Sequence, residues 1–318
     1  MNKKLSLSLF LGLFFFVSLF CQTSAKAEKE GFVSVSQLNY EIFYAPENLR
    51  PGQALVVALR SLRVKSETLD QNPLKMNFIE REFSLRKLGD GWQGVAAVPL
   101  GTRPGSYKLS IKFKDGAGLV LPITVFAHDY GEQRLTVPKE MATPMLPENL
   151  KKINRDRQNL RRIYASSGTA LLLDEEVRPP LASKITSPFG LRRLFNGKPR
   201  APHGGIDFRA AVGVPIVAAA KGRVALAEEL YYSGNLVIID HGLDIFTLYM
   251  HLDKISCCPG DIVHPGQIIG TVGSSGRVTG PHLHWGVKVA GVFVDPLRFV
   301  TDSKHLLELP WEVEKWQK

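Results

Sequence analysis

The sequence predicts a mainly β protein made of two β-rich units that a helical connector joins. The chain has 318 residues, enough for about two domains. Short runs of apolar, β-branched and aromatic residues, separated by glycine-containing turns, occupy both halves of the chain. Between them, residues 148–164 repeat apolar side chains at helical spacing.

The first 27 residues have the pattern of a signal peptide. Lys3 and Lys4 form a positive start, residues 5–20 are almost continuously apolar, and residues 25–27 (AKA) place small side chains where a signal peptidase cuts. A membrane anchor needs about 20 apolar residues and usually lacks such a cleavage site. We therefore expect cleavage after Ala27, no stable membrane span afterwards, and export to the periplasm or cell envelope, or secretion.

The three cysteines do not predict a disulfide framework. Cys21 would leave with the signal peptide. Lipidation of Cys21 is an alternative, which Phe20 disfavours because that processing needs a small residue before the cysteine. The remaining pair, Cys257 and Cys258, is adjacent in sequence and has no second pair nearby, so it is a poor tetrahedral zinc site. We expect two thiols, with a strained vicinal disulfide as the alternative.

The mature chain is predicted to remain basic. Loss of residues 1–27 removes Lys3, Lys4 and Lys26 and no acidic residue, which lowers the formal net charge from +10 to about +7. A basic surface suits anionic polymers in general. No block of lysine and arginine interleaved with aromatic residues supports a nucleic-acid partner, and we expect none.

Residues 28–128 are predicted to form a β-sandwich-like domain. Several short strands separated by turn residues are typical of a small sandwich. This unit contains no cluster of histidine, cysteine or paired carboxylates, so we expect it to serve as a scaffold or to present substrate. The expected strands are 54–59, 92–99, 107–113 and 119–126.

Residues 129–180 are predicted to form a linker that contains one basic helix. Prolines punctuate its start, and the helix is expected over 148–164. Its charge run is more often a solvated helix face than a nucleic-acid site. The partial apolar stripe consists of Leu150, Ile153, Leu160 and Ile163.

Residues 181–302 are predicted to form an antiparallel β-groove, followed by a tail at 303–318. The alternating pattern of its apolar runs fits antiparallel strands that curl around a groove. The expected strands are 214–220, 236–240, 246–250, 267–272 and 282–289. A short helix in the tail is expected to dock through Leu306, Leu307, Trp311 and Trp316.

This second unit holds six of the eight histidines. Three of its segments stand out: 202–207 (PHGGID), 248–252 (LYMHL) and 279–285 (TGPHLHW). Any one histidine would be unremarkable alone, but H-x3-D, Y-x-H-L and G-P-H-L-H within one β-rich unit indicate a metal site. The histidines expected to lie outside that site are His128, His241, His264 and His305.

The spacing of these residues allows them to converge. Residues two apart on a strand share a face, so His282 and His284 can point into one cleft. His203 and Asp207 would be about 13 Å apart on an extended chain, but the two glycines between them permit a kink. Two histidine nitrogens and one carboxylate leave a zinc ion an open position for water, as in catalytic sites. The remaining histidines would move protons or stabilise an oxyanion. The residues alone leave open which histidine of the HLH segment binds the ion.

The same segments resemble the lysostaphin/LytM-type zinc endopeptidases, also called duplicated-hybrid-motif metallopeptidases. The resemblance implies a wide antiparallel β-groove with zinc at its floor. The chain before the groove resembles, more weakly and on residues 99–109, the β-domain that precedes the catalytic unit in some exported relatives. The main resemblance covers roughly residues 185–299 and rests on 187–192 (SPFGLR), 202–208, 213–215 (GVP), 218–222 (AAAKG), 234–237 (GNLV), 266–270 (GQIIG) and 279–285.

Carried over residue by residue, the resemblance implies that His203, Asp207 and His284 bind one zinc ion per chain. It implies that His251 and His282 form a catalytic pair beside the metal. The implied activity is hydrolysis of peptide cross-links of peptidoglycan by a metal-activated water, and analogy alone suggests D-Ala–diaminopimelate links in the periplasm. The alternatives are a non-catalytic activator of a cell-wall amidase, a cell-wall binder without turnover, and a secreted protease that acts on glycine-rich proteins.

Five glycines are expected to line the approaches to this site. Their missing side chains would leave room for a substrate backbone and offer few pockets for large residues. This favours small bridging residues such as Ala, D-Ala or Gly. The five are Gly204, Gly205, Gly273, Gly276 and Gly280.

Overall fold

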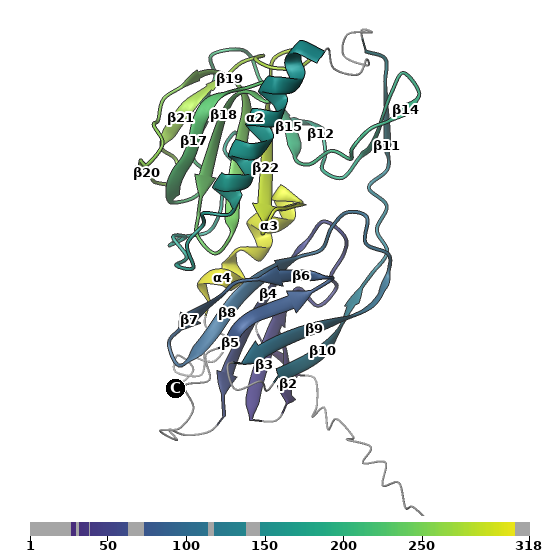
Figure 1. Cartoon of the computed structure of the whole chain (residues 1–318), viewed down its shortest axis with the longest axis vertical. Coiled ribbons are helices and arrows are strands. Elements are labelled where there is room, and N and C mark those ends of the chain that lie inside the picture. The colour runs from purple at the N-terminus through teal and green to yellow at the C-terminus, as the bar shows by residue number, and fades with distance from the viewer. Residues whose placement is uncertain are drawn as a thin grey trace, which may run out of the picture.

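The computed structural model describes residues 27–29, 32–37, 39–62, 73–113, 118–137 and 147–308. Most of the predicted signal peptide, including Cys21, lies outside the described residues, as do Trp311 and Trp316 of the tail. The described chain forms two β units, the first purple to blue and the second teal to yellow in Figure 1. The predicted mainly β fold class is confirmed.

Two sheets build the first unit. One has six strands in the order β1-β2-β3-β4-β8-β7 and the other has four in the order β10-β9-β5-β6. The four strands expected from the sequence correspond to β4, β8, β9 and β10. The bounds in the first sheet are β1 Ala27–Lys29, β2 Phe32–Gln37, β3 Tyr40–Ala45, β4 Ala54–Ser61, β7 Leu85–Leu88 and β8 Gly91–Ala97. The bounds in the second are β5 Pro73–Phe78, β6 Arg81–Phe83, β9 Gly105–Phe113 and β10 Gly118–Val125.

Burial along these strands follows the side-chain alternation of a pleated sheet. In β10, every second residue from Leu119 to Val125 is buried and the residues between them are exposed. In β4, by contrast, residues 54–59 are buried on both faces. The reason is that β4 contacts α3 of the second unit as well as its own sandwich core. One hydrophobic cluster therefore runs through both units.

The second unit is a ten-stranded, antiparallel sheet. Its main path is β12-β15-β22-β19-β18-β17-β20, with β21 paired to β16 and β19, and β23 paired to β22. The sequence predicted five of these strands and missed the other five, of which the longest, β17, forms a hairpin with β18. The bounds are β12 Ile185–Ser187, β15 Ile206–Arg209, β16 Pro215–Val217, β17 Gly222–Leu230, β18 Gly234–Asp240, β19 Ile245–Ile255, β20 Ile262–Val263, β21 Ile268–Val272, β22 His282–Val289 and β23 Val292–Val294.

The expected linker is not free of sheet structure. Residues Glu132–Leu135 form β11, which pairs in parallel with β13 (Arg192–Phe195) of the second unit. A third strand, β14 (Lys198–Pro199), completes this small sheet. Figure 1 shows the chain leaving the first unit and running beside the second as β11 before it reaches α2.

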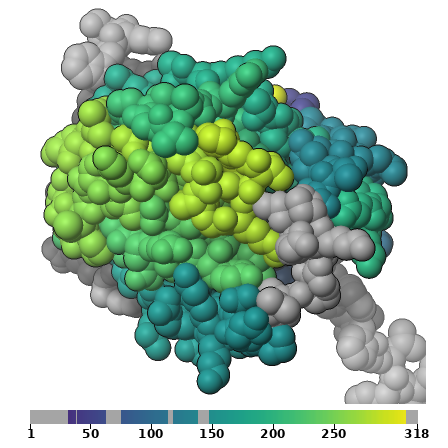
Figure 2. Space-filling view, turned by 90° about the horizontal axis from the view of Figure 1, so that it is seen from above, coloured from purple at the N-terminus to yellow at the C-terminus, as the bar shows by residue number. Residues whose placement is uncertain are grey.

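Helix α2 (Pro147–Tyr164) confirms the predicted basic helix and begins one residue earlier. Ile153 is buried, and Leu160, Ile163 and Tyr164 pack against the cluster formed by β17, β18 and β19. Leu150 was expected in this stripe, but its side chain is 41% exposed, so that assignment is wrong. The helix projects from the side of the second unit as a dark teal ridge in Figure 2.

Among the described helices, none combines the length and apolar character needed to cross a membrane.

Two short helices, α3 (Pro296–Asp302) and α4 (Lys304–Leu307), dock the second unit onto the first. Fully buried Gln93 of β8 donates its side-chain amide to the His305 carbonyl oxygen at 3.1 Å. Arg86 donates to the Gln93 side-chain oxygen and to the Leu306 carbonyl. Leu306 is buried as expected, whereas Leu307 is 37% exposed and does not dock.

Cys257 is half-buried and Cys258 is exposed, and both are free thiols.

Gly242 provides a test of how the segment after α2 is held against the sheet. It has φ +76°, and a Cβ there would overlap the carbonyl oxygen of Ala170. Gly291 has φ +77° but open space around it, so it is the matched control. We expect Gly291→Ala to cost about 1–2 kcal/mol of stability through backbone strain alone. Gly242→Ala should cost about 1–3 kcal/mol more because of the overlap. Urea unfolding measures both, and equal losses would contradict the contact.

Candidate active site

The register of three neighbouring strands assembles the site. Asp207 of β15 lies directly opposite His284 of β22, and His284 lies opposite Met250 of β19. Cross-strand partners project to the same face of a sheet. His282, two residues before His284, shares that face. The predicted convergence of these segments is therefore present in the fold.

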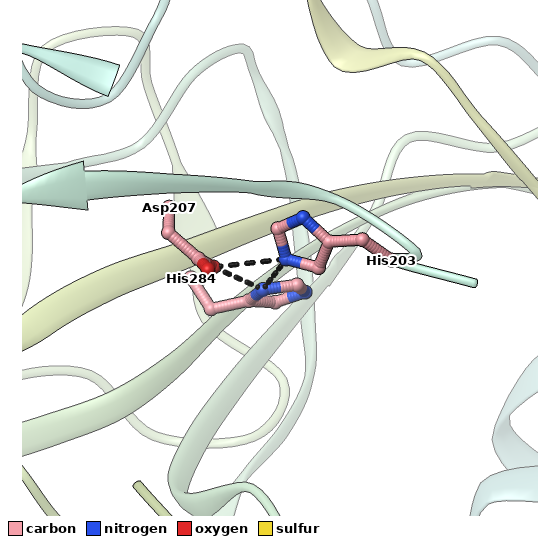
Figure 3. A group of neighbouring side chains, drawn as sticks. All are labelled: His203, Asp207 and His284. Carbon is pink, nitrogen blue, oxygen red and sulfur yellow. Dashed lines mark hydrogen bonds and ion pairs between the residues drawn. The ribbon is translucent and has the colours of Figure 1, made fainter. Parts of the chain in front are cut away.

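His203, Asp207 and His284 form a compact triangle of potential metal ligands (Figure 3). The Asp207 Oδ1 atom lies 3.0 Å from His203 Nε2 and 2.7 Å from His284 Nδ1, and the two nitrogens are 3.1 Å apart. Ligand atoms bound to a tetrahedral zinc ion are roughly 3.3 Å apart. The triangle is thus close to the size that such an ion requires. The kink at the two glycines supplies the proximity of His203 to Asp207.

The donor set of this triangle fits a cation. The Nδ1 atom of His203 donates to the Pro188 carbonyl oxygen at 2.8 Å, so a neutral ring has only a lone pair at Nε2. That lone pair faces the lone pairs of the Asp207 carboxylate, so the pair requires a cation between them, either a metal ion or a proton that makes His203 the hydrogen-bond donor. Burial alone would raise the pKa of Asp207, but hydrogen bonds and charge from His203 and His284 hold it below its usual range. An ionised carboxylate beside ring nitrogens is the chemistry of a metal site.

Two residues that the sequence analysis did not identify, Arg193 and Ser187, contact the atoms of Asp207 and His203 that face away from the triangle. Arg193 of β13 donates from Nη2 to Asp207 Oδ2 at 3.0 Å, the oxygen that faces away from the histidines. Ser187 Oγ lies 3.2 Å from His203 Nδ1 and accepts from Arg193 at 3.0 Å. Metal-binding histidines and carboxylates commonly have such outer partners. No local motif signals Arg193, because the contact depends on where β13 runs.

His251 reaches the site through a β-bulge. Tyr249 and Leu252 of β19 pair with Val237 and Asn235 of β18, so two residues of β19 oppose one residue of β18. His251 has φ +66°, a backbone conformation that non-glycine residues adopt at a cost of about 1–3 kcal/mol. On a regular strand His251 would face away from the side of Met250 and His284. The bulge redirects its ring, which lies 4.9 Å from the His282 ring.

His251 and His282 both present Nε2 as a free acceptor. His251 Nδ1 donates to the Ser275 carbonyl at 3.0 Å, and His282 Nδ1 donates to the Gly280 carbonyl at 2.9 Å. Burial, together with neighbouring His284 and His282, lowers the pKa of His251 to about 3. The His251 ring is therefore neutral at neutral pH and can accept a proton. His282 Nε2 is 3.9 Å from Asp207 Oδ1, outside the triangle.

Solvent reaches the members of the cluster unequally. The exposed fraction of the side chain is 1% for His203, 12% for Asp207 and His284, and 21% for His282. Of these four side chains, His282 is the most exposed. The remaining histidines lie outside the triangle: His241 is buried between the Lys221 carbonyl and Thr247, His264 and His128 are exposed, and His305 packs against Phe32.

The expected role of the glycines is wrong for four of the five. A Cβ at Gly205 would overlap the Trp285 carbonyl oxygen and the His284 ring, and one at Gly204 would press on Phe293. At Gly273 and Gly276 the space is filled by the backbone of residues 253 and 234. Only Gly280 of this set faces open space. At the other four positions the space of the missing side chain is occupied by the protein itself, so it is not available to a substrate backbone.

Comparison with known proteins agrees with this geometry. The model of peptidase family M23 matches residues 201–296. The peptidoglycan DD-endopeptidase ShyA of Vibrio cholerae is 30% identical over 302 residues, which cover 84% of this chain and 68% of the relative. The chain belongs to peptidase family M23. It is therefore a metallopeptidase.

Two other M23 relatives match over different extents. The DD-carboxypeptidase/endopeptidase Mpg of Neisseria meningitidis is 36% identical over 132 residues, 42% of this chain but only 30% of the relative. The crystal structure of a protein assigned as a peptidase M23 from Pseudomonas aeruginosa superimposes with a TM-score of 0.59 at 28% identity. It covers 79% of this chain and 94% of that chain, so the likeness extends beyond the second unit.

The M23 match includes all five predicted site residues but not the residues that support them. His203, Asp207, His251, His282 and His284 fall within 201–296. Ser187 and Arg193 precede it. The metal triangle of this M23 chain thus depends on contacts from outside the matched segment.

Removal of Asp207 tests the triangle directly. Because its Oδ1 atom is shared by both histidines, Asp207→Ala should abolish stoichiometric binding of a divalent transition metal. The loss of affinity should exceed the roughly 10–100-fold typical of outer partners. Asp174→Ala, which removes an exposed carboxylate that pairs with Lys221, is the control and should bind metal normally. Elemental analysis of purified protein provides the measurement, and full occupancy in Asp207→Ala would exclude this ligand.

Proposed function

We propose that this M23 metallopeptidase is an exported zinc endopeptidase that hydrolyses peptide cross-links of peptidoglycan. One observation carries the proposal: three ligand atoms converge within 3.1 Å of one another, and the rings of two further histidines, His251 and His282, lie beside them. Three ligands plus an open position are typical of catalytic zinc rather than structural zinc.

His203, Asp207 and His284 are the proposed ligands, through Nε2, Oδ1 and Nδ1. A bound zinc ion would lower the pKa of a coordinated water and polarise the scissile carbonyl. The carboxylate contributes a single oxygen, because Arg193 occupies the other. His282 is proposed as non-ligating, since its Nε2 atom is further from Asp207 than either ligand nitrogen.

His251 and His282 are the proposed catalytic pair. Each ring is fixed by a hydrogen bond from Nδ1 to a backbone carbonyl, which keeps Nε2 available. The lowered pKa of His251 keeps its ring neutral at neutral pH, so Nε2 can accept a proton. His282 is the more exposed of the two and is proposed to contact the substrate, either as a proton carrier or as a donor to the oxyanion.

The proposed substrate rests on the relatives. ShyA and Mpg both carry an endopeptidase name, and ShyA is named for peptidoglycan. The signal-peptide pattern supports export, which a cell-envelope substrate requires. The formal net charge of about +7 expected after loss of residues 1–27 suits an anionic polymer. Cleavage of D-Ala–diaminopimelate links is the specific form of the proposal.

We also propose that the chain divides by function into four segments. Residues 28–128 form a scaffold or substrate-presenting domain, and residues 129–180 form the linker. Residues 181–302 form the catalytic domain, and residues 303–318 form the tail. Strand β11 modifies this division, because residues 132–135 pair with the catalytic domain rather than serving as a free linker.

Single histidine variants separate ligands from proton carriers. His251→Ala and His282→Ala should retain zinc and lose about 10²–10⁴-fold in turnover, the usual contribution of general acid–base groups. His284→Ala should lose both zinc and turnover. His264→Ala is the matched control, since this exposed histidine lies outside the cluster. Zinc content and rate are measured on the same preparations. A His282→Ala variant without zinc, beside a His284→Ala variant with zinc, would reverse the two roles.

Digestion of purified sacculi tests the substrate. We expect cross-linked muropeptide dimers to disappear and monomers to appear in matching amounts, because an endopeptidase cuts between stem peptides. Chromatography with mass spectrometry follows the products, with Asp207→Ala as the inactive control. Free stem peptides on bare glycan would indicate an amidase.

The alternatives predict different results in the same assay. A non-catalytic amidase activator or a cell-wall binder without turnover would leave the muropeptides unchanged. A protease for glycine-rich proteins would cleave such a protein and spare the sacculi.

A further inference from the structure

The strand that connects the two units contributes a side chain to the surroundings of the metal triangle. Gln133 lies on β11, before α2, and its Oε1 atom accepts from Arg193 Nε at 3.2 Å. The same Oε1 atom is 3.4 Å from Ser187 Oγ. The pairing of Gln133 with Arg193 in the β11–β13 register places these two side chains together.

Arg193 transmits this contact to the ligands. Its guanidinium bonds Gln133 through Nε, while Nη2 bonds both Asp207 Oδ2 and Ser187 Oγ. A planar guanidinium held through two of its nitrogens by three partners has little freedom to rotate. The Asp207 carboxylate is therefore held with Oδ1 aimed at His203 and His284. Ser187 in turn contacts His203 Nδ1, so the group touches two of the three ligands.

We infer that Arg193 and Gln133 are positioning residues of the metal site, and that Gln133 acts through Arg193. The inference rests on the proposed ligand set. It makes β11, a strand outside both the M23 match and the predicted catalytic domain, part of the working site. Neither residue touches substrate or zinc in this arrangement.

Charge and orientation act in opposite directions at Arg193. A guanidinium repels a nearby cation, and this repulsion alone would weaken zinc binding. Orientation acts in the opposite direction and favours zinc binding. Without Arg193, the Asp207 Oδ2 atom would be buried without its charged partner, and the carboxylate would be free to turn. Outer partners that orient ligands typically contribute about 10–100-fold in metal affinity. We expect orientation to be the larger effect, because Arg193 bonds the Asp207 oxygen that faces away from the ligand nitrogens.

The test measures zinc affinity of the full chain by competition with a chromophoric chelator. Arg193→Ala should weaken binding by about 10–100-fold. Arg193→Lys should recover part of this loss, because one ammonium can reach Asp207 but cannot bridge to Gln133 as well. Gln133→Ala should weaken binding by about 3–10-fold. Arg192→Ala is the matched control: this neighbour on β13 is 66% exposed, pairs loosely with Asp129, and should leave the affinity unchanged.

The double variant decides whether Gln133 acts through Arg193. In the Arg193→Ala background, Gln133→Ala should have no further effect, whereas independent contributions would add. Circular dichroism checks that each variant is folded. If Arg193→Ala does not fold, the zinc affinities of the single variants Arg193→Lys and Gln133→Ala, and of the variant that combines them, provide the test. Wild-type or tighter zinc binding by Arg193→Ala overturns the inference, as does an equal loss in Arg192→Ala. A wild-type chain that binds no zinc refutes the proposed ligand set instead.

Discussion

The antiparallel register of β15, β22 and β19 is the constraint on which the site depends. A slip of one residue would turn Asp207 or His284 to the opposite face of the sheet. The residues that alternate with the histidines on β22 prevent such a slip. Leu283 and Trp285 are fully buried, and burial of each contributes about 1.5–3 kcal/mol that a slipped strand would lose. The apolar core thus sets which face carries the chemistry.

The parts of the site that the sequence predicts are pairs of residues that lie close together along the chain. His282 and His284 share a face because side chains alternate along a strand. His203 and Asp207 can meet because the two glycines between them permit a kink. The choice between His282 and His284 as the ligand came only from the family resemblance. Distances in the fold now add a physical reason, because the His284 nitrogen is 2.7 Å from Asp207 and the His282 nitrogen is 3.9 Å away.

The features that the sequence did not reveal depend on tertiary contacts. The bulge at His251 carries no glycine or proline to mark it, and its reversed φ is imposed by pairing on both sides of β19. The glycines were assigned to substrate because their own neighbours in space were unknown. Arg193 and Gln133 meet across 60 residues of chain, a separation at which no periodic pattern can be read.

The connector between the two units lies against the site at two places. Tyr130 donates to the Pro51 carbonyl of the first unit and packs its ring edge-on against Phe189. The adjacent Gly190 lies so close to the Tyr130 ring that a Cβ there would overlap it, and Gly190 bonds the His203 carbonyl. Three residues after Tyr130, Gln133 bonds Arg193, which bonds Asp207. The connector therefore bears on how two of the proposed metal ligands are held, and the first unit bonds it through Tyr130.

The parallel pairing of β11 with β13 also has a consequence for the order in which the chain folds. Hairpins such as β17–β18 close over a few residues, so little chain entropy opposes them. Strand β11 meets β13 across 60 residues of chain, and Asp207 meets His284 across 77. Contacts between residues so far apart in sequence form slowly. We therefore expect both the ligand triangle and the support behind Asp207 to be completed late in folding, after the local hairpins have closed.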